Sequence, residues 1–165
     1  MAKITLKGNP INTSGNLPAK GTHAPDFTLV KSDLSNLSLS ELKGKKLVLS
    51  ISPSLDTSIC ATSVRKFNQM AAGKTNTMVL AITKDLPFAS GRFCTTEGII
   101  NVVALSGFRD TVFGKSYGVE IVDGAFAGLY ARCLIVVDEK GIITHSQLVP
   151  EIAQEPDYDA ALAIL

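Results

Sequence analysis

Cys60 is the residue of this 165-residue chain best placed for covalent chemistry. It follows the apolar run 47–52 and a short turn, and it precedes residues 61–70, which contain neither Gly nor Pro. This order predicts a strand, a turn and a helix, with Asp56 or Thr57 as the N-cap and Cys60 in the first helical turn. Unpaired backbone N–H groups and the helix dipole favour negative charge there. The position therefore predicts a lowered thiol pKa and a nucleophilic sulfur.

A structural interpretation of Cys60 competes with this one. Cysteine is a common small apolar residue in protein cores, and Cys60 shares a helical stripe with Val64 and Phe67. The neighbouring residues favour chemistry instead. Thr57 is three residues earlier, so its hydroxyl can lie on the same side of the first turn as the thiol. Pro53 stiffens the preceding loop and removes a competing N–H donor.

The motif Pro53-x-x-x-Thr57-x-x-Cys60 resembles the active-site signature of the peroxiredoxins. The longer segment 52–68 is similar to that of the bacterial thiol peroxidases, which are atypical two-cysteine peroxiredoxins. The likeness continues through residues 85–94 and Ala131-Arg132 to Glu155-Pro-Asp-Tyr158, so it covers essentially the whole chain. The resemblance implies a thioredoxin-like fold and a thiol-dependent peroxidase that needs no metal, haem or flavin.

The resemblance also implies catalytic roles for four residues. Cys60 would be the peroxidatic cysteine that attacks the peroxide, and the Thr57 hydroxyl would hydrogen-bond that peroxide. Pro53 would shield the site. Arg132 would stabilise the thiolate and the charge that develops in the transition state.

The sequence by itself allows this role for Arg132. It begins a strand that is otherwise apolar, residues 133–137, where a guanidinium is costly unless it is paired. An arginine at a strand end that reaches out to water is the alternative. Arg65 and Arg92 are weaker candidates, because each is expected to be a surface cation.

The second step of the reaction needs another thiol, because attack on a peroxide leaves a sulfenic acid that a second cysteine can condense with. The resemblance assigns this resolving role to Cys94, with an intramolecular Cys60–Cys94 disulfide that thioredoxin would reduce. Cysteines on separate intact helices are seldom close enough to bond, so we expect local unwinding during each turnover. Cys133 adjoins Arg132 but alternates to the other side of the strand, which favours a buried spectator and leaves it open as a second candidate.

Composition indicates an ordinary globular protein, most simply one domain over residues 1–165, with 45% hydrophobic and 19% charged residues. The formal net charge of +1 gives no reason to expect nucleic acid or a membrane surface as a partner. The first residues lack the apolar core of a secretory signal, which predicts a cytoplasmic location. The resemblance adds a homodimer as an expectation.

Strand and helix patterns alternate along most of the chain and end in a hairpin, residues 132–148, followed by a helix that Pro156 opens. This order predicts an α/β fold with a mixed central sheet flanked by helices, preceded by an N-terminal β-hairpin within residues 3–13. A peroxidase acting on hydrogen peroxide and organic hydroperoxides is the leading interpretation. The alternatives are a peroxide-responsive interaction protein and a binding module with inert thiols.

Overall fold

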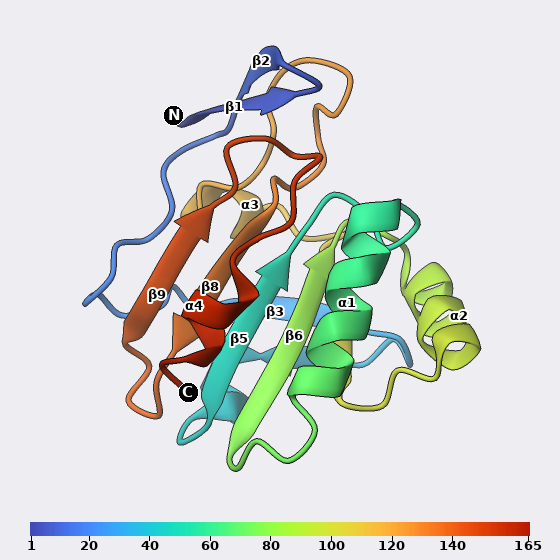
Figure 1. The fold of residues 1–165 in the computed structure, drawn as a ribbon, viewed down its shortest axis with the longest axis vertical. Coiled ribbons are helices and arrows are strands. Elements are labelled where there is room, and N and C mark those ends of the chain that lie inside the picture. The colour runs from blue at the N-terminus through green and yellow to red at the C-terminus, as the bar shows by residue number, and fades with distance from the viewer.

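The protein is built around a seven-stranded mixed sheet, with a two-stranded hairpin beyond one end of it (Figure 1). The computed structural model describes residues 1–165. The strand order in the main sheet is β4-β3-β7-β6-β5-β8-β9, and β1 pairs with β2. The strands are β1 (Lys3–Leu6), β2 (Asn9–Asn12), β3 (Thr28–Lys31), β4 (Asn36–Ser38), β5 (Lys46–Ile51), β6 (Thr77–Thr83), β7 (Val102–Ser106), β8 (Cys133–Val137) and β9 (Ile143–Leu148). The helices are the 3₁₀-helix η1 (Leu39–Leu42) and the α-helices α1 (Ser58–Met70), α2 (Pro87–Glu97), α3 (Phe113–Ser116) and α4 (Tyr158–Leu162).

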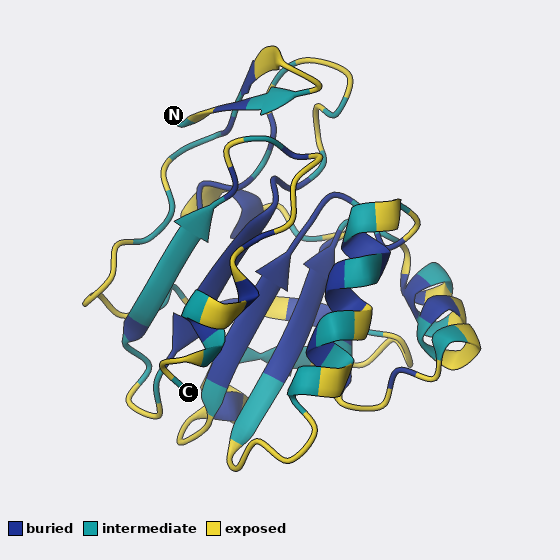
Figure 2. Ribbon diagram, viewed as in Figure 1, coloured by how far each residue is buried: buried dark blue, intermediate teal, exposed yellow.

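Two apolar cores lie on opposite faces of the main sheet. Successive side chains of a strand point to opposite faces, and in β5 Leu47 and Leu49 belong to one core while Val48 belongs to the other. Helices α1 and α4 cover the face of Val48 (Figure 1), and Phe113 of α3 belongs to the core on the other face. Burial on both faces explains why β5 is a nearly continuous apolar run, and the central strands are buried along most of their length (Figure 2).

The topology of the sheet brings three separate segments to one of its ends. Strands β5 and β6 are parallel neighbours, so the loops that leave their C-terminal ends emerge together. The first loop leads into α1 and the second into α2. Strand β8 runs antiparallel to β5 with Cys133 opposite Ile51, which places Arg132 beside the loop that precedes α1.

The N-terminal hairpin is tied to the segment after β9 through the carboxylate of Glu151. The backbone N–H groups of Lys7 and Gly8, at the turn of the hairpin, donate to its two oxygens over 3.0 Å, and the Thr5 hydroxyl donates over 2.7 Å. Donation from the N–H groups of Ala153 and Gly8 and from the Thr5 hydroxyl lowers the pKa of this carboxyl to about 2. The hairpin is thus held at the end of the sheet where α1 begins (Figure 1).

The predicted mixed α/β fold with an N-terminal hairpin is confirmed. The last helix begins at Tyr158 and not at Pro156, since the preceding Asp157 caps it by accepting from the N–H of Ala160. Strand β4 was not predicted, because three residues carry too little alternation to be recognised.

Candidate active site

Cys60 is the third residue of α1, and its side chain is completely buried. The helix begins at Ser58 with Thr57 as its N-cap, so the thiol lies in the first turn as the sequence predicted. Nη2 of Arg132 donates to the sulfur over 3.3 Å. A cationic donor and the positive end of a helix both favour negative charge on that sulfur.

Arg132 is almost fully buried, with 3% of its surface exposed. Its Nε donates to the backbone carbonyl of Ile152 over 2.9 Å, and this bond fixes the plane of the guanidinium against Cys60. Its Nη1 has no hydrogen-bond partner although it is buried. Buried donors are nearly always paired, so this group is free to bind an oxygen atom that enters the site.

The hydroxyl of Thr57 does not cap the helix. It donates instead to the backbone carbonyl of Ser54 over 2.9 Å, and the N–H of Thr57 donates to the same carbonyl over 3.2 Å. Since the proton of the hydroxyl is engaged, its lone pairs remain available to accept a hydrogen bond. Pro53 is buried at the start of this loop.

A cavity of about 160 Å³ opens between the loop, the first turn of α1 and the N-terminal hairpin. Cys60 does not line it, but the three residues before Cys60 and its partner Arg132 do. A small molecule in the cavity would therefore meet Thr57 and Arg132 first. The lining residues are Leu6, Lys7, Pro53, Thr57, Ser58, Ile59, Phe126, Arg132, Ile152 and Ala153.

The other two cysteines lie in different surroundings, and all three thiols are free. Cys94 is on α2, half-buried against the core shared with α1, and burial raises the pKa of its thiol. Cys133 is buried in the core on the opposite face of the sheet. Burial raises the pKa of its thiol strongly, and the positive charge of Arg132 only partly offsets this.

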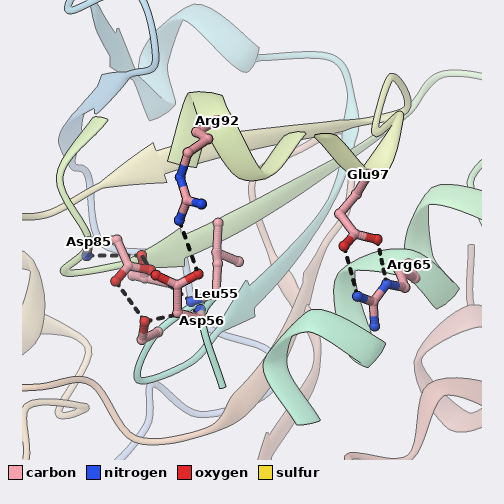
Figure 3. A network of polar contacts seen from close by, with 8 residues as sticks. Leu55, Asp56, Arg65, Asp85, Arg92 and Glu97 are labelled. Carbon is pink, nitrogen blue, oxygen red and sulfur yellow. Dashed lines mark hydrogen bonds and ion pairs between the residues drawn. The ribbon is translucent and has the colours of Figure 1, made fainter. Parts of the chain in front are cut away.

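Arg65 and Arg92 do not contact Cys60. Nε and Nη2 of Arg65 donate to the two carboxylate oxygens of Glu97 over 2.7 and 2.9 Å, which joins α1 to α2. Nη2 of Arg92 lies 3.6 Å from a carboxylate oxygen of Asp56 (Figure 3). These two ion pairs are partly exposed to solvent, and neither includes Cys60 or Arg132.

Sequence reasoning missed the part of the site that distant segments contribute. Leu6 and Lys7 come from the hairpin, and Phe126 comes from the loop before β8. The acceptor that orients Arg132 is a backbone carbonyl, which any residue at position 152 would supply. No motif marks these residues, because only the tertiary fold brings them together.

No group of three or more His, Cys, Asp or Glu side chains is arranged to hold a metal ion. None of the helices combines the length and the apolar character of a membrane span.

Known proteins resemble this chain in sequence and in fold. The sequence pattern of the Redoxin family matches residues 19–162. The thiol peroxidases of Mycobacterium tuberculosis H37Rv and Corynebacterium glutamicum are each 54% identical over 165 residues, covering 100% of this chain and 99% of theirs. The crystal structure of a peroxiredoxin-like protein from Aquifex aeolicus superposes with a TM-score of 0.94 at 38% identity, covering 99% of this chain and 95% of the other. The chain therefore belongs to the Redoxin family, in the branch formed by the thiol peroxidases.

Proposed function

We propose that this chain reduces hydrogen peroxide and organic hydroperoxides with Cys60 as the peroxidatic cysteine. One observation carries the proposal: Arg132 lines a cavity together with Thr57, holds the buried sulfur with Nη2 and has an unpaired Nη1. Such an arrangement provides a nucleophile, a donor for an oxygen that gains charge and an acceptor for a peroxide O–H. Thr57, Arg132 and Pro53 are the remaining site residues in this proposal.

The first step is a displacement at oxygen. The Cys60 thiolate attacks the terminal oxygen of H–O–O–R, an S–O bond forms and the O–O bond breaks. The sulfur is oxidised to a sulfenic acid, and the leaving oxygen is reduced and takes a proton to become water or an alcohol. Arg132 stabilises the charge on both reacting atoms, and Thr57 orients the peroxide by accepting its O–H. Cys60 is fully buried, so the peroxide reaches its sulfur from the cavity that Thr57, Ser58 and Ile59 line.

The second step joins Cys94 to the oxidised Cys60. The Cys94 thiol attacks the sulfenic acid, the S–O bond breaks and water leaves as the disulfide forms. Both cysteines lie within intact helices in the reduced protein, so α1, α2 or both unwind locally before the sulfur atoms meet. A dithiol protein of the thioredoxin class then reduces the disulfide.

Two further parts of the proposal concern where and how the protein works. The location that we propose is the cytoplasm, a reducing compartment in which the thiols that the reaction consumes are restored. Leu86 and Phe88, at the start of α2, are 52% and 68% exposed, and they support a homodimer that buries the end of the molecule near Cys60. Sedimentation of the wild type beside Phe88→Ser tests the dimer.

Peroxide consumption in the presence of thioredoxin, thioredoxin reductase and NADPH tests the activity. We expect sustained turnover by the wild type and none by Cys60→Ser. Cys94→Ser should undergo a single oxidation of Cys60 without thioredoxin-linked turnover, whereas the matched variant Cys133→Ala should turn over like the wild type. Stoichiometric oxidation of the wild type without turnover would favour a peroxide sensor. A Cys60–Cys133 bridge found by peptide mapping would overturn the assignment of Cys94.

A further inference from the structure

The carboxylate of Asp85 holds the loop that carries Thr57 (Figure 3). Asp85 itself does not line the cavity. One oxygen, Oδ1, accepts from the Ser54 hydroxyl over 2.7 Å. The other, Oδ2, accepts from the N–H of Leu55 over 2.7 Å and from the Thr83 hydroxyl over 3.0 Å. Hydrogen bonds to an ionised acceptor are about twice as strong as neutral ones, so this carboxylate is the main anchor of the loop.

Asp85 is itself fixed by the end of the sheet. It follows β6 by two residues, and its N–H donates to the Thr83 hydroxyl over 3.1 Å. Its own carbonyl accepts a bond from the hydroxyl of Ser106, the last residue of β7. The ends of β6 and β7 therefore fix the position of the Asp85 carboxylate, which faces the loop that follows β5.

A short chain of contacts leads from Asp85 to the peroxide cavity. Asp85 holds the side chain of Ser54 and the N–H of Leu55, the two groups on either side of the Ser54 carbonyl. That carbonyl accepts both the hydroxyl and the N–H of Thr57. Leu55 is buried, with 3% of its surface exposed, so the loop has little freedom to shift while the Asp85 bonds are intact.

We infer that Asp85 is a positioning residue for the peroxide reaction, which sets the orientation of the Thr57 hydroxyl through the Ser54 carbonyl. The inference rests on the proposed peroxidase function of Cys60. Asp85 touches neither Cys60 nor the cavity, so it acts only through the loop. Misplacing a reacting group by about 1 Å can cost about 100-fold in rate, which sets the scale of the expected effect.

The first experiment compares the second-order rate constant for oxidation of Cys60 by hydrogen peroxide in three variants. Asp85→Ala removes all three acceptor bonds and should lower the constant about 100-fold, whereas Asp85→Asn keeps one acceptor oxygen and should lower it about tenfold. The matched control is Asp138→Asn. Asp138 accepts two backbone N–H groups over 2.9 Å in a turn at the opposite end of the sheet, and its variant should react like the wild type.

The second experiment separates positioning from a general loss of structure. Thr57→Val removes the hydroxyl that Asp85 is inferred to orient, so adding Asp85→Asn to it should lower the rate constant by no more than about twofold. Losses that multiply in the double variant would contradict the inference, as would wild-type rates in Asp85→Asn and Asp85→Ala. A wild type without peroxidase activity, or an active Cys60→Ser, would instead contradict the proposed function.

Discussion

The two cysteine-bearing helices differ in how they are held. On α1, Cys60 is fully buried, its sulfur is bonded to the buried Arg132, and one turn later the Ser63 hydroxyl lies 2.7 Å from the hydroxyl of Tyr158. On α2, Cys94 is half-buried, and the polar ties are the ion pairs of Glu97 with Arg65 and of Arg92 with Asp56. The Arg92 and Asp56 side chains are 69% and 65% exposed.

This difference indicates a division of work between the helices. Buried hydrogen bonds to charged groups are costly to break, whereas exposed ion pairs are weakened by water and salt. In the proposed reaction, the peroxide therefore meets a site with fixed geometry at the start of α1. The proposed disulfide requires α1, α2 or both to unwind. The side-chain polar contacts of α2 lie at the surface, so α2 is the helix that we expect to unwind first.

Removing the Arg132 guanidinium, which donates to the sulfur of Cys60 on α1, should have the largest effect. Arg132→Met replaces the arginine by an uncharged side chain of similar length and leaves Cys60 and the Ile152 carbonyl without their donor. We expect the rate constant for oxidation of Cys60 to fall by about 100-fold or more, because the loss of one such donor typically costs about 10²–10³-fold. Stopped-flow mixing with hydrogen peroxide measures it. Arg109→Met, at an arginine that bonds to Asn36, is the matched control and should react normally.

The next largest effect should be the pH dependence of disulfide formation, which reports on Cys94 of α2 and not on Cys60 of α1. Burial raises the pKa of Cys94, so the neutral thiol is favoured in folded α2 and the reactive anion is scarce at neutral pH. Ionisation at higher pH then destabilises the buried position and favours unwinding. The rate of disulfide formation after a single oxidation should rise about tenfold per pH unit and keep rising above the ordinary thiol pKa of about 8.5. A rate that does not change between about pH 6 and 9 would contradict this account.

The smallest effects come from a buried contact of α1 and from the surface ion pair that joins α2 to α1. Tyr158→Phe removes the hydroxyl that meets Ser63, and a buried bond of this kind contributes about 1 kcal/mol to the free energy of unfolding. Glu97→Gln removes a surface ion pair, and we expect a smaller loss that disappears at high salt. Urea unfolding at low and high salt measures both. Equal losses, or a loss from Glu97→Gln that persists in salt, would show that the surface contact of α2 is not weaker than the buried contact of α1.

Much of the fold, and the strand, turn and helix around Cys60, could be predicted because the sequence patterns that indicate them lie within single segments. Apolar runs and Gly-bearing turns located most of the strands, and a segment without Gly or Pro located α1. The energetic cost of an unpaired guanidinium in an apolar strand indicated that Arg132 has a partner. These arguments need only neighbouring residues and elementary energetics.

The contacts that hold the Thr57 loop could not be read in the same way. Asp85 is one polar residue among several after a strand, and only the pairing of β5 with β6 puts it opposite Ser54. Side chains that follow neighbouring parallel strands do meet at one edge, so the strand order would have supplied the missing signal. The Ile152 carbonyl has no such signal, since every residue carries the same group.

The N-terminal hairpin has a practical consequence for anyone who trims or tags this protein. The match to the Redoxin family begins at residue 19, yet Leu6 and Lys7 form one wall of the cavity beside Arg132. A fragment cut to the family boundaries would keep every residue with a proposed chemical role and still lose that wall. An affinity tag is therefore better fused after Leu165, away from the cavity that we propose binds the peroxide (Figure 1).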